Sequence, residues 1–336
     1  MRLAVLPIVL LLVLVLASAV GDIPISLENT VHILLFKLGL PSGAATWPAQ
    51  DEIIVWDLRL PHVVAAALVG AGLAVAGTLF QSVLRNPLAD PYVIGTAAGA
   101  QLGVTTSLLL PVQFALLGFG SMQTFAFAGA VGTVLLVYLL ASIGGSARVV
   151  TLLLAGFVTS SFLISGTSFL LSISNRANDI LSWTMGGINV SSWDQLKSTA
   201  PIVVAAVAVS WLMAPRLDVL LLGEESATHL GIHVERLKLG AVLVASLLTA
   251  LAVTLAGIVA FVGLVVPHAA RIFYGPGHRL LLPTSALGGA IFVVLADTLS
   301  RVLLAPTIIP LGSITALIGA PVFLYLLRRN RRDYSV

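Results

Sequence analysis

The chain has 336 residues, of which 9% are charged and 58% are hydrophobic, with a mean hydropathy of +1.08 and a formal net charge of +3. A soluble domain carries roughly a quarter charged residues, so this composition excludes a globular protein that is covered by water. The absence of cysteine excludes disulfides, thiolate metal sites and cysteine nucleophiles.

Apolar runs recur along the whole chain, and they are long enough to cross a lipid bilayer as helices. The runs are unbroken, whereas a transmembrane β-barrel would show roughly ten-residue segments of alternating polarity. We therefore predict an all-α, multi-pass membrane protein that forms one transmembrane domain over residues 1–336. The eighth of about ten expected spans is short, and Pro267 within it predicts a kink or a broken helix. The spans are expected near 3–20, 61–84, 92–111, 122–141, 149–173, 198–215, 239–257, 258–272, 281–304 and 309–327.

The first span also fits a cleavable signal peptide, with Ala17-Ser18-Ala19 as the candidate cleavage site. Orientation follows from the basic residues. With the N-terminus inside, the inner segments hold twelve of the seventeen lysines and arginines, and the outer segments hold five. The positive-inside rule then places both termini in the cytoplasm. The basic run from Arg328 to Arg332 predicts a tail that contacts the membrane surface rather than a nucleic acid.

Two outer segments are long enough to hold structure of their own. The segment 21–60 carries an acidic patch, 51–57. The segment 174–197 predicts a short helix that lies in the membrane interface, with Trp183 and Trp193 as its anchors.

Between the second and third spans, the stretch QSVLRNPLADPYVIG (81–95) gathers polar residues and two prolines. Because proline interrupts a helix, the stretch predicts a tight re-entry into the membrane, with Arg85, Asn86 and Asp90 at the inner water boundary. A merely solvated loop is the alternative interpretation.

The fifth span carries a stripe of hydroxyl groups. Its serines are spaced by four, three and four residues, so they share one face of a helix. They are Ser161, Ser165, Ser168 and Ser172. The stripe could join helices through small hydroxyl residues, or it could form a weakly polar wall along a solute path, and the sequence alone does not separate these two hypotheses.

The largest inner segment, 214–238, is amphipathic and predicts two short helices broken at Gly223 and Gly231. No lysine stands in a Gly-Lys-Ser/Thr setting, so we expect no ATP-binding loop in this chain. The middle thirds of the spans hold essentially no ionisable residue, which disfavours an ion-coupled carrier. A pore subunit that a separate ATPase drives fits better. The competing class is an intramembrane enzyme, for which His268 and Ser165 would be the candidate residues.

Four stretches resemble the FecCD family of permeases, which serve ATP-binding-cassette (ABC) importers of iron–siderophores, haem and vitamin B12. They include "RLPHVVAAALVGAGLAVAGTLFQSVLRNPLADPYVIG" and "GIVAFVGLVVPHAARI", and lie at 59–103, 220–240, 257–290 and 309–327. The resemblance implies the type II importer permease fold and a homodimer with its pathway at the dimer interface. It further implies two cytoplasmic ATPase subunits, an external solute-binding protein and a bacterial inner-membrane location. No catalytic residue, cofactor or metal is expected in this subunit. A ferric siderophore is the expected solute, with haem or vitamin B12 (cobalamin) as alternatives.

The resemblance also implies roles for individual residues. Two departures from the family pattern bear on the docking contacts: His62 replaces a common arginine, and Ile308-Ile309 stand where an acidic residue often precedes the final Pro-x-Gly. The expected cytoplasmic gate is Asn86, Pro87 and Leu88; the expected ATPase-coupling residues are Gly223, Glu224, Glu225 and Gly231; the expected binding-protein contacts are Arg59, His62 and Arg301.

Overall fold

The computed structural model describes residues 2–21, 23–41, 47–110, 112–116, 118–142, 149–190 and 192–329. Within these ranges the only sheet is a two-residue antiparallel pair, β1 (Ala115–Leu116) and β2 (Phe119–Gly120). Everything else that is regular is helical. The helices in the first half are α1 (Arg2–Ala19), α2 (Leu27–Lys37), α3 (Ala49–Glu52), the π-helix η1 (Ile53–Arg59), α4 (Leu60–Val83), α5 (Thr96–Leu109), α6 (Ser121–Ala141) and α7 (Val149–Ser172). Those in the second half are α8 (Ala177–Thr184), α9 (Trp193–Leu220), α10 (Glu224–His229), α11 (Val234–Ala256), α12 (Val262–Tyr274), α13 (His278–Val302) and α14 (Leu311–Arg329).

Each of the ten predicted spans contains a helix, which confirms the predicted all-α membrane fold. Among the described residues, six helices are long and apolar enough to cross a membrane: the continuous run through α3, η1 and α4, and then α6, α7, α9, α11 and α13. The apolar helices α1, α12 and α14 are shorter, as is α5. The tail residues 330–336 lie outside the described part of the chain.

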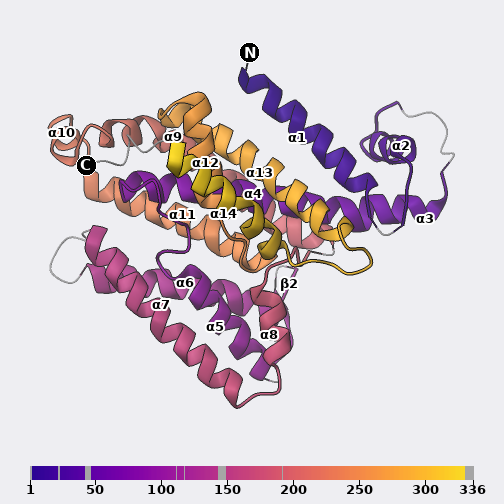
Figure 1. Cartoon of the computed structure of the whole chain (residues 1–336), viewed down its shortest axis with the longest axis horizontal. Coiled ribbons are helices and arrows are strands. Elements are labelled where there is room, and N and C mark those ends of the chain that lie inside the picture. Colours follow the sequence, from indigo (N-terminus) through magenta and orange to yellow (C-terminus); the bar gives the residue numbers. More distant parts are fainter. Residues whose placement is uncertain are drawn as a thin grey trace.

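Helix α4 runs through the centre of the molecule, and most of its residues are buried (Figure 1). It packs against α13, α11, α12 and α9. Two glycines of α4 allow its backbone to approach the neighbouring helices closely. A Cβ atom at Gly70 would collide with the carbonyl of Gly289 on α13, and one at Gly77 would collide with the carbonyl of Gly263 on α12. Because lipid gives helices little hydrophobic reason to associate, such close backbone contact supplies the packing.

Helices α5, α6 and α7 form a second group beside this central bundle (Figure 1). Helices α5 and α6 are in close contact, because Gly99 and Gly129 face each other's backbone. Helix α7 covers this pair on one side. Much of the remaining surface of α7 itself is exposed, including Phe157, Phe162 and Phe169.

The predicted irregularity in the eighth span lies earlier than expected. Helix α11 ends at Ala256, the chain turns through Gly257 and Phe261, which both have positive φ, and α12 then runs without interruption through Pro267. Pro267 therefore does not break the helix. The chain breaks at Gly257, where the backbone conformation favours glycine.

The turn between α11 and α12 is stabilised by hydrogen bonds from other segments. The Tyr92 hydroxyl donates to the Val259 carbonyl at 3.2 Å and accepts from the Val259 amide at 3.1 Å. The amides of Gly187 and Asn189 donate to the last carbonyls of α11. A break inside a membrane protein needs such partners, because lipid offers the freed backbone groups none.

At the end of the molecule opposite α10, helices α2 and α3 and the π-helix η1 pack together (Figure 1). We refer to these two ends as the α2 end and the α10 end. At the α2 end Lys37 pairs with Glu52 at 2.5 Å, so this acidic residue holds the outer segment together.

The predicted short helix in 174–197 is α8, but Trp183 was wrongly assigned as an interfacial anchor. Its side chain is buried among residues of α5, α6 and α11. Trp193 donates its indole N–H to the Trp56 carbonyl at 2.9 Å, so it contacts η1.

Candidate functional site

The stretch between α4 and α5 forms a turn that its own polar side chains close. The Asn86 side-chain oxygen accepts from the Leu88 amide at 2.9 Å, and the Asp90 carboxylate accepts from the Tyr92 amide at 2.8 Å. Such bonds from Asn and Asp to the backbone two residues ahead are typical of tight turns. Asn86 and Leu88 are exposed, whereas the backbone around them is held. We call residues 84–95 the gate loop, after the role that the family resemblance implies for Asn86, Pro87 and Leu88.

The gate loop is attached to the end of α9. Arg85 has a φ of 48°, which is uncommon for a residue with a side chain. Its guanidinium donates to the carbonyl of Leu220, the last residue of α9, at 3.1 Å. Burial raises the pKa of the Asp90 carboxyl above its usual range, and the hydrogen bond from the Tyr92 amide partly opposes that shift. The loop is therefore a constrained turn and not a freely solvated segment.

The segment 214–238 is broken at the two predicted glycines, Gly223 (φ 119°) and Gly231 (φ 82°). Only the piece between them is a separate short helix, α10, because the residues before Gly223 extend α9 and those after Gly231 lead into α11. Glu224 pairs with the largely buried Lys238 on α11 at 2.7 Å, whereas Glu225 is exposed.

Exposed leucines flank α10. Leu222 is 68% exposed on one side, and Leu230 is 64% exposed on the other. A hollow of about 450 Å³ lies beside the helix and is lined by Glu224, Glu225 and His233, among others. We call this region, from Leu221 to Glu235, the α10 surface. It combines acidic and apolar groups that have no cover in the single chain.

All four serines of the predicted stripe are exposed on one face of α7, and each donates its hydroxyl proton to a carbonyl of α7 itself. These are Ser161, Ser165, Ser168 and Ser172. The stripe therefore joins no other helix within the described part of this chain. Its hydroxyl oxygens give an otherwise apolar face weak polarity.

At the α2 end, Arg59 is not presented to a partner as expected. Its side chain is buried, and its guanidinium donates to the carbonyls of Ala19 at 2.8 Å, Ser18 at 3.4 Å and Ile23 at 2.5 Å. A buried charge needs such partners, so Arg59 fastens the end of α1 to the start of α4.

His62 and Arg301 share one carboxylate, that of Asp297 on α13. The His62 Nε2 atom lies 3.0 Å from Asp297 Oδ1, and Arg301 Nε lies 3.0 Å from Oδ2. The Asp297 side chain is 4% exposed and that of Arg301 is 15% exposed. His62 and Arg301, which were expected to contact a binding protein, are therefore engaged with Asp297 within the chain.

A further cluster of polar side chains, which the sequence did not reveal, lies at the α10 end. His278 on α13 has its Nδ1 atom 2.7 Å from Asp218 Oδ1 on α9, and its Nε2 atom 2.5 Å from Ser82 Oγ on α4. The three residues are separated by 60 and 196 positions in the chain, so spacing alone offers no signal for them. We call them the Asp218–His278–Ser82 chain.

The residues of the enzyme alternative are not brought together. Ser165 is exposed on α7, whereas His268 is buried on α12. In the part of the chain that the structure describes, no three or more His, Asp and Glu side chains are grouped to hold a metal ion.

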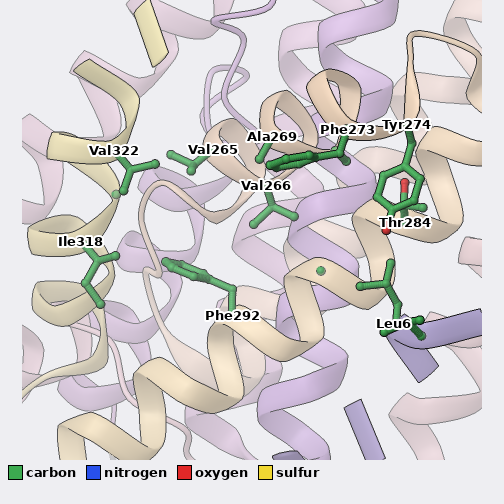
Figure 2. Close-up of a pocket in the computed structure, with 14 residues that line it drawn as sticks. Leu6, Val265, Val266, Ala269, Phe273, Tyr274, Thr284, Phe292, Ile318 and Val322 are labelled. Atoms are coloured by element: carbon green, nitrogen blue, oxygen red, sulfur yellow. The ribbon is translucent and has the colours of Figure 1, made fainter. Parts of the chain in front are cut away.

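A large hollow of about 700 Å³ lies between α1, α12, α13 and α14 (Figure 2). Val265, Val266, Phe292 and Ile318 point into it, and the hydroxyls of Tyr274 and Thr284 lie together at one side. The lining is almost wholly apolar, so in a bilayer this hollow suits hydrocarbon and not a polar solute. The serine face of α7 lies elsewhere.

The gate loop, the α10 surface and the serine face are three exposed features of a multi-pass helical fold. The model of the FecCD transport family matches residues 9–329. The chain belongs to this family. Permeases of this family are subunits of ABC importers and are not enzymes themselves, and they work with ATPase partners in a dimeric arrangement.

Curated relatives cover nearly the whole chain. The cobalamin import system permease of Halobacterium salinarum is 39% identical over 96% of this chain and 94% of its own length. The Fe(3+) dicitrate transport system permease FecC of Escherichia coli is 38% identical over 92% of this chain and 90% of its own. The hemin transport system permease of Yersinia pestis is 36% identical over 86% and 88% of the two chains.

A solved structure supports the same conclusion. It is described as a metal-chelate type ABC transporter in an inward-facing conformation, and it has 29% sequence identity and a TM-score of 0.84 to this chain. The match covers 98% of this chain and 99% of that one. Fold and family are thus shown together, whereas the relatives' solutes differ.

The shared carboxylate at the α2 end gives a testable expectation for stability. Asp297→Asn removes the negative charge of a buried carboxylate that Arg301 and His62 share, so we expect it to lower the free energy of unfolding by about 3 kcal/mol. The matched control is Asp194→Asn, because Asp194 and its partner Lys197 are both more than 70% exposed. That change should stay within about 0.5 kcal/mol of the wild type. Unfolding of the purified variants in detergent measures both, and equal effects would contradict the structural role of Asp297.

Proposed function

We propose that two copies of this chain form the membrane pathway of an ABC importer for a ferric chelate, most suitably a ferric siderophore. The observation that carries this proposal is the exposed serine face of α7, in a chain whose family consists of such permeases. An exposed helix face with regularly placed hydroxyls is unusual against lipid, which favours cover by a second subunit. Facing each other across the dimer, two such faces would line a weakly polar path.

The wall is suited to a solute that passes without being bound tightly. Ser161, Ser165, Ser168 and Ser172 donate their protons to their own helix, which leaves lone pairs toward the path. Such a surface can solvate the polar periphery of a chelate and does not compete for its metal. Fe(3+) dicitrate and hemin permeases among the relatives support an iron-containing solute. Cobalamin is the second candidate, because the Halobacterium salinarum relative matches over 96% of this chain.

The membrane is proposed to be a cell membrane of the bacterial inner-membrane type, with both termini in the cytoplasm. The α10 end then faces the cytoplasm and the ATPase subunits, and the α2 end faces the external binding protein. The bias of lysine and arginine toward the inner segments supports this orientation. Since Arg59, His62 and Arg301 are engaged within the chain, docking at the α2 end would rely on neighbouring exposed groups such as Asp57.

Transport by the reconstituted importer tests the proposed solute. The complex of this permease with its ATPase subunits and binding protein, in proteoliposomes, should take up a ⁵⁵Fe-labelled ferric siderophore only when ATP is present. Haem and labelled cobalamin serve as the competing solutes in parallel assays. ATP-dependent uptake of cobalamin alone would contradict the ferric assignment and leave the permease assignment standing. Uptake that needs no ATPase subunit would contradict both the ferric assignment and the permease assignment.

Asn86, Pro87 and Leu88 are proposed to form the cytoplasmic gate. The turn is rigid in its backbone and exposes the Leu88 side chain, so two copies could meet across the pathway and close it. Leu88→Ala shortens that side chain, and we therefore expect faster passive leak of a solute trapped in proteoliposomes without ATP. Leu88→Met keeps nearly the same volume and should leak like the wild type. Equal leak for all three proteins would reduce the turn to a structural role.

The α10 surface is proposed to dock into the ATPase subunit. Leu230→Asp replaces an exposed leucine of this surface with a charged residue. We expect ATPase binding to weaken by about 2 kcal/mol, the loss typical of a residue that contributes strongly to an interface. Leu38, which is equally exposed at the α2 end, offers the matched control Leu38→Asp. Glu225→Lys should weaken binding mainly at low salt, because rim charges act through screened attraction. Co-purification and surface-immobilised affinity measure these effects, and a loss with Leu38→Asp equal to that with Leu230→Asp would place the docking surface elsewhere.

A further inference from the structure

The Asp218–His278–Ser82 chain connects three helices that meet at the α10 end. Asp218 lies on α9, His278 is the first residue of α13 and Ser82 is next to the last residue of α4. The carboxylate of Asp218 also accepts from the backbone amide of His278 at 2.7 Å, so it caps the start of α13 as well as binding the ring. An ionised carboxylate only accepts, which places a proton on Nδ1 of His278.

Burial makes these contacts costly to break. The side chain of His278 is 1% exposed, and Ser82 is 4% exposed. A buried polar group that loses its partner forfeits its hydrogen bond without gaining water. The hydroxyl of Ser82 lies within hydrogen-bond distance of both His278 Nε2 and the Thr78 carbonyl. The ends of α4, α9 and α13 are therefore held as one unit.

The chain lies between the two segments to which we assign moving roles. Asp218 precedes Gly223, where α10 begins, by five residues, and Ser82 precedes Asn86 of the gate loop by four. The hydrogen bond from Arg85 to the Leu220 carbonyl is a second connection between the same two regions. Both connections join the end of α9 to the end of α4. Only a few residues of chain lie between them and α10 on one side, or the gate loop on the other.

We propose that the Asp218–His278–Ser82 chain transmits the movement of α10 to the gate loop, so that the three side chains are positioning residues for coupling. This proposal rests on the gate and ATPase-docking roles proposed above. When an ATPase subunit shifts α10, the end of α9 moves with it. The hydrogen bonds of His278 to the half-exposed Asp218 and to the buried Ser82 then carry the end of α4, and with it Leu88, in the same direction. Without them the two segments would move independently.

The natural absence of cysteine allows the two movements to be followed separately by spin labelling. A single cysteine at Leu88 reports the distance between the two gate loops of a dimer, and one at the exposed Thr228 reports the distance between the two α10 helices. Each labelled permease is assembled with its ATPase subunits in proteoliposomes. Distances are measured with and without ATP in a hydrolysis-deficient complex. The solute transported per ATP is measured separately in the active complex without the cysteine substitutions or the labels.

In the otherwise wild-type protein we expect ATP to change both distances. In Ser82→Ala and in Asp218→Ala the α10 distance should still change, whereas the gate distance should respond weakly and transport per ATP should fall roughly tenfold. The double variant should behave like either single variant, because both changes interrupt the same chain. Ser82→Thr and Asp218→Asn keep a hydroxyl and an acceptor oxygen, and they should restore the gate response.

A general loss of packing would give a different pattern. Ser210→Ala is the matched control, since Ser210 is fully buried on α9 and its hydroxyl bonds only to the Ala206 carbonyl one turn away. We expect the control to keep both responses. If the gate distance still follows α10 in Ser82→Ala and Asp218→Ala, or if Ser210→Ala loses it equally, the proposed transmission is wrong. If ATP changes neither distance in the otherwise wild-type protein, the gate and docking assignments fail first, and the transmission fails with them.

Discussion

The close approach of helix backbones around α4 is the constraint on which this permease depends. Lipid tails are as apolar as leucine, so the helices gain little from hiding apolar side chains from one another. Gly70 and Gly77 lie where any larger residue would collide with the carbonyls of Gly289 and Gly263. These crossings fix α12 and α13 against α4, and the positions of the gate loop and of α10 follow from where these helices end.

Polar interactions are concentrated at the two ends of this bundle and have different forms there. At the α2 end, Arg59 and Asp297 are held by several partners each, which fastens α1, α4 and α13 together. At the α10 end, hydrogen bonds join helix ends that lead into exposed loops. One end thus fastens helices together, and the other connects the α10 surface to the gate loop. The weakly polar face of α7 lies between them, outside both networks.

Much of the fold was predictable because apolar run length, proline and glycine act locally. The spans and the breaks at Gly223 and Gly231 belong to this class, as does the tight turn at Asn86. The misassignments have a common physical cause. Arg59 and Trp183 are amphipathic or ionisable residues near span ends, and a sequence does not tell whether such a residue faces water or a partner from a distant part of the chain. The same holds for His278, to which the sequence analysis gave no role. Only the tertiary contacts decide that. The serine stripe was predicted as a face, but the absence of a helix covering it in the described chain came from the structure.

The break at Gly257 shapes how the chain can enter a membrane. Helix α12 has 13 residues and is about 20 Å long, whereas the hydrocarbon core is roughly 30 Å thick. Such a helix cannot be held across the bilayer alone during synthesis, and the backbone groups of the preceding turn would meet lipid unpaired. The hydroxyl of Tyr92 can bind that turn, and the amides of Gly187 and Asn189 can bind the last carbonyls of α11, only once the earlier segments are in place. Biogenesis of the C-terminal half is thereby made dependent on the N-terminal half, so the order of translation becomes part of how this protein is assembled.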